Sequence, residues 1–295
     1  MSDALATGRK MEAEGNQGMS DALLNIKDLK VTFPVRKGRI EVVKNISFRL
    51  GRERLGIVGE SGSGKSMTGR AILRLIRAPG KMTAQELQFK NIDLLGLSEK
   101  KMRVLRGAGI SMIMQDPKYS LNPVMTVGAQ ISEALEIHER ISGKEKKERV
   151  NGMLESVRIN DPGSVAEMYP HQLSGGMGQR VMIAMMLIPR PDILIADEPT
   201  SALDVSVQRQ VLALINDLVR ERGMGLILIS HDIKLVSAFC DRILVMYDGR
   251  IVEECTAARL GDAKHPYTRG LLASIPRMNE TRDQLPVPDR KSRGL

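Results

Sequence analysis

The stretch GESGSGKS at residues 59–66 decides how this sequence folds. It matches the pattern G-x-x-x-x-G-K-[ST], a loop whose backbone N–H groups converge on phosphate oxygens. The apolar segment RLGIVG (54–59) precedes it as a buried strand, and MTGRAILRLI (67–76) follows with apolar residues at helical spacing. Strand, loop and helix are the context that the motif requires, because the helix N-terminus adds partial positive charge. A glycine-rich turn with a chance lysine is the alternative, and this context argues against it.

The residues of this loop have separate expected tasks. Lys65 would reach the β- and γ-phosphates of a nucleotide, and the Ser66 hydroxyl would be a ligand of Mg²⁺. The rest of the loop would cradle phosphate through its backbone, and comprises Gly59, Glu60, Ser61, Gly62, Ser63 and Gly64.

A second apolar segment, ILIADE (193–198), carries two carboxylates at its end. The carboxyl end of a buried strand is where an α/β ATPase needs acidic groups. Adjacent strand residues point to opposite faces, so Pro199 is expected to end the strand and let both acids serve one site. Asp197 would hold Mg²⁺, directly or through water, and Glu198 would polarise the attacking water. An Asp-Glu pair is weak evidence alone and strong evidence beside a phosphate loop.

Two further polar residues follow apolar segments. His231 comes after LILIS (226–230), where it could bind the γ-phosphate and orient the water, although a lone histidine is more often structural. Gln115 ends SMIMQ (111–115), where its amide could contact both Mg²⁺ and the water. We predict catalytic roles for both, and a metal-binding role for Gln115.

A second glycine-rich element, LSGGMGQR, occupies residues 173–180. Ser174 can cap the helix that follows, and Gly175 and Gly176 expose backbone N–H groups, which together make a second anion site. One nucleotide needs one cradle, so the second element raises the question of whose phosphate it holds.

Strand and helix patterns alternate along most of the chain, which predicts an α/β fold with a mainly parallel sheet covered on both faces. Two alternating segments near the N-terminus predict an antiparallel β subdomain, and residues 126–190 show helical patterns without a convincing strand. The expected strands are LLNIKDLKVTF (23–33), EVVKNISFRL (41–50), RLGIVG (54–59), ISMIMQD (110–116), DILIADEP (192–199), GLILISHD (225–232) and RILVMYDGRIVEE (242–254), the last with an Asp248-Gly249 turn, and a helix at 205–223 ends on Gly223.

The predicted organisation has three parts. They are a disordered extension (1–22), a nucleotide-binding domain (23–255) with a helical subdomain at about 117–190, and a C-terminal extension and tail (256–295). The charge run at 143–149 is expected to be a solvated face and loop. MSDAL occurs at 1–5 and again at 19–23, which indicates either a second start at Met19 or a coincidence.

Composition narrows the class of protein only in part. A net charge of +9 fits nucleic acid, an anionic membrane surface, phosphate ligands or solubility. Cys240 and Cys255 cannot by themselves supply the four thiolates of a zinc or iron–sulfur site, and free thiols in a reducing cytosol are favoured over a disulfide. The longest apolar run, VMIAMMLI (181–188), is far shorter than the roughly 20 residues of a membrane-spanning helix. The N-terminus lacks the apolar core of a secretory signal.

Taken in order, the motifs over roughly residues 24–255 resemble those of ATP-binding cassette (ABC) ATPases, a class of P-loop NTPases. The resemblance implies ATP and Mg²⁺ as bound groups, and a signature loop (Ser174, Gly175, Gly176) that closes over ATP held by the other subunit of a pair. It makes SALD (201–204) the loop that links the two sites, with Asp204 at its end. Phe33 would stack on adenine, or else be an ordinary strand residue. Met177 and Gly178 depart from the common signature, which often has Gln and Arg there.

Two further segments, QDPKYSLNPVMTVGAQI (115–131) and KHPYTRGLLASIP (264–276), resemble ATPase subunits of importers for peptides, nickel and opines. This implies a second ATPase subunit, identical or not, two permeases docked near Gln115 and the helical insertion, and an extracytoplasmic solute-binding protein. The chain would be peripheral on the cytoplasmic face of the bacterial inner membrane. His265 is either a metal ligand or a packing residue, and the lack of cysteine after Cys255 predicts no iron–sulfur centre.

The rival classes are a soluble ABC ATPase acting on nucleic acid or ribosomes, and an exporter ATPase. The first usually carries long coiled coils, zinc modules or a second cassette, and the HPYT segment disfavours the second. An importer ATPase would not touch the cargo, so the transported substrate is not readable from this chain, and no nucleic-acid partner is expected.

Overall fold

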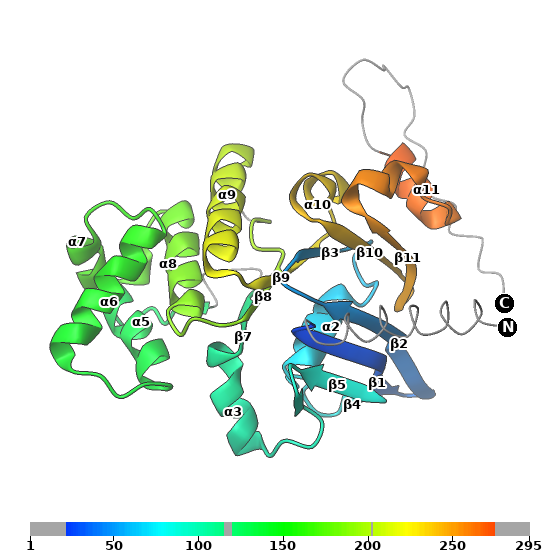
Figure 1. Ribbon diagram of the computed structural model, residues 1–295, viewed down its shortest axis with the longest axis horizontal. Coiled ribbons are helices and arrows are strands. Elements are labelled where there is room, and N and C mark those ends of the chain that lie inside the picture. The colour runs from blue at the N-terminus through cyan, green and yellow to red at the C-terminus, as the bar shows by residue number, and fades with distance from the viewer. Residues whose placement is uncertain (1–21, 115–119, 202, 275–295) are drawn as a thin grey trace, which may run out of the picture.

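A computed structural model describes residues 22–114, 120–201 and 203–274. Within these ranges, two sheets lie together at one end of the molecule and a group of helices forms the other end (Figure 1). The predictions for the N-terminal extension before residue 22, for Gln115 and for the tail after residue 274 lie outside the described residues.

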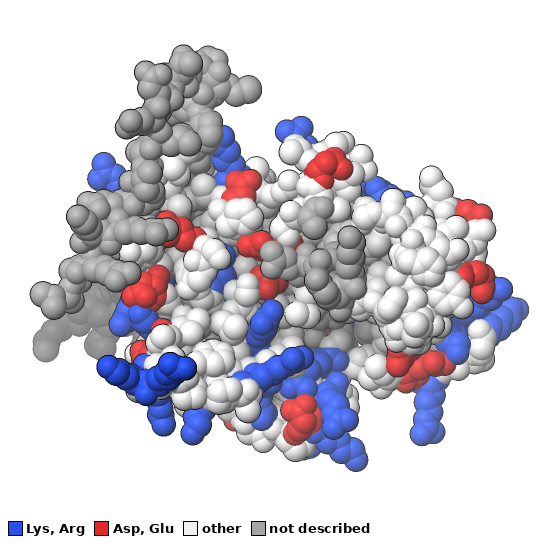
Figure 2. All heavy atoms as spheres, turned by 180° about the vertical axis from the view of Figure 1, so that it is seen from behind, with Lys and Arg blue, Asp and Glu red and all other residues white. Residues whose placement is uncertain are grey.

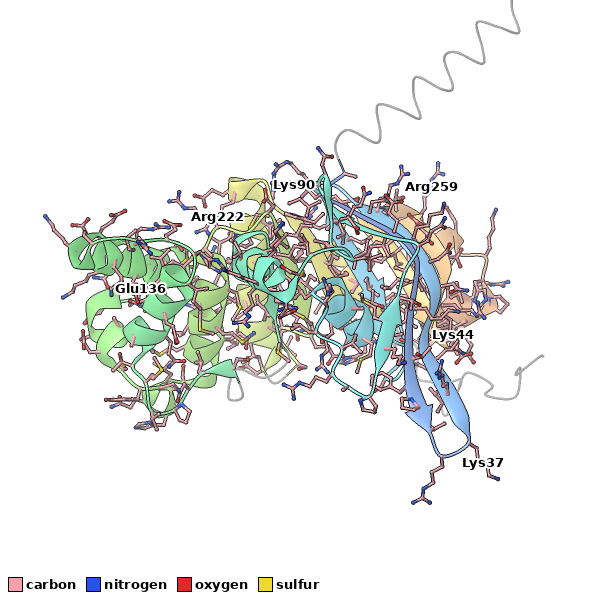
Figure 3. All side chains as sticks on the ribbon, turned by 90° about the horizontal axis from the view of Figure 1, so that it is seen from below. Lys37, Lys44, Lys90, Glu136, Arg222 and Arg259 are labelled. Atoms are coloured by element: carbon pink, nitrogen blue, oxygen red, sulfur yellow. The ribbon has the colours of Figure 1, made fainter. Side chains whose placement is uncertain are left out.

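The first sheet is antiparallel and is built around two long strands. β1 (Leu24–Val35) and β2 (Gly38–Leu50) pair as a hairpin whose tip carries Lys37 and projects beyond the neighbouring strands (Figure 3). The remaining strands are β4 (Lys81–Thr83), β5 (Glu86–Phe89) and β6 (Ile92–Asp93), in the order β2-β1-β5-β6 with β4 beside β1. The two long strands confirm the predicted antiparallel subdomain. The three short ones were not predicted, because two to four residues show no readable alternation.

The second sheet has the order β11-β10-β3-β9-β8-β7 and is parallel from β10 to β7. β11 is antiparallel to β10 across the predicted Asp248-Gly249 turn, where both residues have positive φ, 45° and 78°. This confirms the mainly parallel core. The strands are β3 (Arg54–Val58), β7 (Ile110–Ile113), β8 (Ile193–Asp197), β9 (Gly225–Ser230), β10 (Arg242–Tyr247) and β11 (Arg250–Thr256).

Helix α2 (Lys65–Ile72) contacts both sheets and buries Ala71 and Ile72. It is shorter than the apolar spacing through Ile76 suggested, because Arg74 adopts a left-handed conformation with φ 54°. α9 (Val205–Arg222) ends at Gly223 with φ 59°, as predicted. The other helices at this end are α3 (Glu99–Ala108), α10 (Ile233–Phe239), a 3₁₀ turn at Ala257–Asp262 and α11 (Pro266–Ala273).

The helical end of the molecule matches the predicted insertion. It comprises α5 (Val127–Glu136), α6 (Gly143–Ser156), α7 (Pro162–Glu167), a 3₁₀ turn at Pro170–Gln172 and α8 (Gly175–Leu187) (Figure 1). The charge run 143–149, expected as a face and loop, forms the first two turns of α6, because Ser142 caps that helix by accepting from the Glu145 N–H at 3.3 Å. Helix α8 packs on β7 and so joins the helical end to the parallel sheet.

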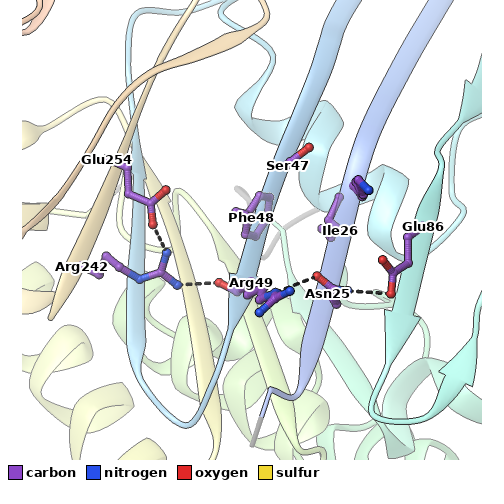
Figure 4. Close-up of a pocket in the computed structure, with 9 residues that line it drawn as sticks. Asn25, Ile26, Ser47, Phe48, Arg49, Glu86, Arg242 and Glu254 are labelled. Carbon is purple, nitrogen blue, oxygen red and sulfur yellow. Dashed lines mark hydrogen bonds and ion pairs between the residues drawn. The ribbon is translucent and has the colours of Figure 1, made fainter. Parts of the chain in front are cut away.

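A row of polar side chains ties the two sheets together across a surface hollow (Figure 4). The Arg242 guanidinium on β10 donates to Glu254 and to the Arg49 backbone carbonyl, both at 2.5 Å. Arg49 donates to Asn25 at 3.3 Å, and Asn25 donates to Glu86 at 2.6 Å. These contacts fix the antiparallel sheet against the edge of the parallel one.

The structure also bears on two expectations drawn from composition, one about membrane-spanning helices and one about the cysteines. No helix in the described ranges is long and apolar enough to cross a bilayer. Cys240 and Cys255 are free, as favoured, and burial raises the pKa of the Cys240 thiol to about 12, so this thiol stays protonated.

Candidate active site

The phosphate loop leaves β3 and ends where α2 begins, and close contacts require glycine at two of its positions, Gly59 and Gly64. A Cβ on Gly59 would lie 2.1 Å from the Met246 carbonyl oxygen, so any side chain there would collide with backbone. Gly64, the N-cap of α2, has φ 101°, and its Cβ would lie 2.6 Å from the Val42 oxygen. The loop is therefore held tightly between β2 and β10.

Lys65 lies beneath this loop and is 5% exposed. Its ammonium donates to the backbone carbonyls of Gly59 and Glu60, both at 2.7 Å. Burial lowers the pKa of Lys65, while the nearby Glu198 and Asp197 carboxylates oppose that shift. The positive charge is thus held at the mouth of the loop by two carbonyls and two acids.

The two predicted metal ligands that the structure describes meet at this site. The Ser66 hydroxyl donates to Asp197 Oδ1 at 2.8 Å, although 131 residues separate them in the sequence. Asp197 is the last residue of β8 and is only 4% exposed. Burial raises its pKa, and the Ser66 hydrogen bond partly offsets this effect. A hydroxyl and a carboxylate side by side are the donor set that Mg²⁺ prefers, so these residues fit the ion.

Glu198 lies just beyond the end of β8, as the position of Pro199 predicted. Its φ of 47° turns the chain, so that Asp197 and Glu198 do not point to opposite faces of one strand. His231, which follows β9, places Nδ1 3.1 Å from Glu198 Oε1. The Glu198 side chain is 19% exposed and that of His231 is 62% exposed, so the pair faces solvent from the end of the sheet.

The second glycine element begins α8, and Ser174 caps that helix as predicted, accepting from the Met177 N–H at 3.3 Å. A Cβ on Gly176 would lie 3.0 Å from Val207 Cγ1, and one on Gly175 3.9 Å from Leu203 Cδ2. The signature therefore packs beside the start of α9. Among the described residues, no hydrogen bond joins it to the chain's own phosphate loop.

The remaining predicted residues have simpler surroundings. Asp204 caps α9 by accepting from the N–H groups of Ser206 and Val207, both at 3.0 Å. Phe33 is half-buried, and its ring packs against the chain after α2, where a Cβ on Gly80 would lie 2.5 Å from Phe33 Cε1. This packing accounts for Phe33 as a strand residue, and stacking on adenine stays a prediction. Gln115 lies outside the described residues.

One contact at the phosphate loop could not be predicted from the sequence patterns. The Tyr267 hydroxyl accepts a hydrogen bond from the Glu60 N–H at 2.9 Å, across 207 residues. Tyr267 belongs to the HPYT segment, which resembles a family pattern, and nothing in that pattern points to the loop. His265, in the same segment, caps α11 by accepting from the Tyr267 N–H at 3.2 Å.

A parallel sheet with a phosphate loop, an acidic strand end and an inserted helical unit defines an ATP-binding cassette of the P-loop NTPase class. A family profile described as ABC transporter matches residues 43–201. The dipeptide transport ATP-binding protein DppD of Haemophilus influenzae is 52% identical over 266 residues, covering 90% of this chain and 81% of that protein. The oligopeptide transport ATP-binding protein OppD of Escherichia coli is 46% identical over 275 residues, covering 92% and 81%.

Solved structures agree with this class. A dimeric post-hydrolysis state of the ATP-binding cassette MJ0796, bound to ADP and Pi, superimposes with a TM-score of 0.71 at 30% identity, covering 79% of this chain and 98% of that one. The chain belongs to the ABC transporter family, which confirms the resemblance drawn from its motifs. It is an ABC ATPase with the fold that the motifs predicted.

Proposed function

We propose that this chain hydrolyses ATP to power a bacterial importer of dipeptides or oligopeptides. The observation that carries the proposal is the convergence of Ser66, Asp197, Glu198 and His231 on the mouth of the loop that holds Lys65. The similarity to dipeptide and oligopeptide transport ATP-binding proteins supports peptides over nickel or opines as cargo.

The loop residues would bind ATP before any chemistry takes place. Backbone N–H groups at the start of α2 and the helix dipole favour phosphate, and Lys65 adds a charge that its two carbonyl partners hold in position. Ser66 and Asp197 would hold Mg²⁺, which supplies charge neutralisation between the β- and γ-phosphates.

Glu198 and His231 would act on the attacking water. The carboxylate of Glu198 accepts the proton or orients the water, and His231 Nδ1, 3.1 Å away, keeps the carboxylate in one orientation. His231 is the more exposed partner, so its ring can also reach the γ-phosphate that sits over the loop. These are the roles that the sequence predicted.

The permease partners would dock in an apolar groove between β7 and α5, which has a volume of about 460 Å³. Exposed apolar side chains on its rim support this: Met114 is 45% exposed and Ile137 is 67% exposed. A groove of this kind suits a helix laid across it. Its apolar lining includes Leu75, Met112, Met114, Ala134, Ile137 and Met186, and Met114 directly precedes Gln115 in the sequence.

The charge distribution supports a place on the cytoplasmic face of the inner membrane. Basic side chains gather along the lower edge of the face in Figure 2. Helix α3 carries basic residues that include Lys100, Lys101 and Arg103. Arg103 and Arg106 also line the apolar groove, together with Glu133, so this part of the basic edge reaches the proposed permease site. Anionic lipid would attract such an edge. The same charges leave nucleic acid as the alternative ligand.

The test is ATP-dependent uptake of a labelled dipeptide by proteoliposomes that hold the assembled transporter. Glu198→Gln removes the water-activating carboxylate while keeping the shape of the side chain. We expect turnover to fall by about 10²- to 10⁴-fold with ATP binding retained, since positioned acid–base groups contribute on that scale. Undiminished turnover in this variant would refute the assignment. Stable binding to DNA or ribosomes, without co-purifying permeases, would favour the soluble alternative.

A further inference from the structure

The segment after β11 is anchored to the nucleotide-binding domain by one carboxylate. Glu253 on β11 accepts from the backbone N–H groups of Lys264 and His265, at 3.0 and 2.8 Å. These backbone hydrogen bonds are the main reason that the pKa of Glu253 is lowered. They fix the start of α11 at the edge of the parallel sheet, so the first turn of α11 has a defined position.

That first turn places Tyr267 against the end of β10. Its ring packs on Tyr247, with centroids 4.3 Å apart and planes inclined at 36°. Burial raises the pKa of Tyr267 to about 12, so the phenol stays neutral at physiological pH. The packing of the ring on Tyr247 fixes where the hydroxyl oxygen can accept a hydrogen bond.

Its donor is a single peptide group of the phosphate loop. The N–H of Glu60 donates to Tyr267 at 2.9 Å, and the carbonyl of the same peptide group, Gly59 O, accepts from Lys65 Nζ at 2.7 Å. Gly59 has no freedom to move toward β10, because its Cα already abuts the Met246 carbonyl. The peptide that orients the Lys65 ammonium is thus held from its other side by Tyr267.

We propose that Tyr267 is a positioning residue for ATP: its hydroxyl fixes the Gly59–Glu60 peptide and thereby the Lys65 ammonium, and it makes the C-terminal segment part of the nucleotide site. This inference rests on the proposed ATPase function. A peptide group held at both ends loses less freedom when phosphate binds, and binding is then stronger.

The test uses Tyr267→Phe in the full chain, with Tyr247→Phe as the matched control. The control removes a hydroxyl from the stacked partner ring and leaves the Glu60 hydrogen bond intact. Removing the hydroxyl deletes the exposed hydrogen bond that holds the Glu60 N–H, so we expect the KM for ATP and the Kd of a fluorescent ATP analogue to rise by about 2- to 10-fold. We expect kcat to stay within about twofold of wild type, because Glu198, His231 and Asp197 are untouched.

Amide hydrogen exchange gives a second readout that does not depend on turnover. The peptide covering residues 57–62 should exchange its amide hydrogens faster in Tyr267→Phe than in wild type, and at the wild-type rate in Tyr247→Phe. Unaltered exchange and ATP affinity in Tyr267→Phe, or equal effects in both variants, would overturn the inference. Lys65→Ala separates the two proposals: if it abolishes ATP binding while Tyr267→Phe has no effect, the ATPase function stands and the role of Tyr267 falls. If Lys65→Ala also binds ATP normally, the proposed function itself fails.

Discussion

At the residue scale, the site places a lysine and one carboxylate, Asp197, where water is largely excluded. Lys65 and Asp197 are both nearly inaccessible, and burial shifts the pKa of each toward its neutral form. Each charged group opposes the shift of the other, so the pair is more stable than either would be alone. Burying these two charges is unfavourable for the stability of the fold, and bound metal and phosphate would reduce that penalty. Such a penalty is common where function competes with stability.

This cost predicts how Asp197→Asn should behave. The pKa of Asp197 is raised above its ordinary value of 3.8, so its ionised form destabilises the fold at pH values above the folded-state pKa. The asparagine oxygen can still accept from Ser66. With a metal chelator present and no nucleotide, we expect the variant to unfold at a higher temperature than wild type at pH 7–8. The expected rise is about 2–4 °C for each kcal/mol of unfavourable free energy that the substitution removes.

The pH dependence checks the cause. The gain should shrink as the pH falls from the folded-state pKa toward the ordinary value of 3.8, because the folded wild-type chain takes up the proton first and the unfolded chain does so only near and below 3.8. Thermal unfolding of the variant and of wild type at pH 4.5, 6 and 8 measures how this gain in melting temperature depends on pH. A melting temperature below that of wild type at pH 8 would show that the carboxylate stabilises the fold, contrary to the expectation.

At the element scale, two glycines in the first turns of α8, Gly176 and Gly178, have different surroundings. Gly176 lies under Val207, where a Cβ would be 3.0 Å from Cγ1. A Cβ on Gly178, where the sequence departs from the common signature, would meet no neighbour within 4 Å, although the glycine itself is buried. Packing thus constrains the first glycine and leaves the second unexplained by contacts.

The difference predicts opposite outcomes for two alanine substitutions. A glycine inside a helix costs about 0.5–1 kcal/mol relative to alanine, so Gly178→Ala should stabilise the chain by about that amount. Gly176→Ala gains the same helix propensity but must displace Val207, so we expect little gain or a loss. Urea unfolding at constant m-value measures both, and a loss of stability in Gly178→Ala would contradict the argument.

Elements with strong local patterns could be predicted from sequence, and those held by distant contacts could not. The parallel strands are continuous apolar runs and the α9 cap is a glycine, so both were readable. β4, β5 and β6 are too short to show a period, and α2 stops early because Arg74 takes a left-handed conformation. At the site, Ser66 and Asp197 belong to sequence motifs, and His231 follows a recognisable apolar strand. Tyr267 could not be predicted, because it contacts a backbone N–H, which every residue except proline has.

At the scale of the whole molecule, the phosphate loop and the signature lie on different parts of the fold. The loop is set between the two sheets, whereas Ser174 begins α8 in the helical unit and packs toward α9. Among the described residues no hydrogen bond links them. We propose that both elements bind phosphate. With one pair of residues proposed to activate water, the chain would then share its sites with a second subunit.

Ser174→Arg tests this sharing. The arginine would block the anion site formed by the signature, so we expect ATP turnover in the assembled transporter to fall by about 10²-fold or more, as when phosphate-facing donors are lost. Binding of ATP by the isolated chain should stay within about twofold of wild type, because its own loop is intact. The matched control is Ser142→Arg: Ser142 caps α6 at 3.3 Å, the distance at which Ser174 caps α8, so it loses an equal cap without touching the signature. Turnover should survive in the control. If Ser174→Arg instead abolished ATP binding by the isolated chain, the signature would serve the chain's own nucleotide and the shared site would be ruled out.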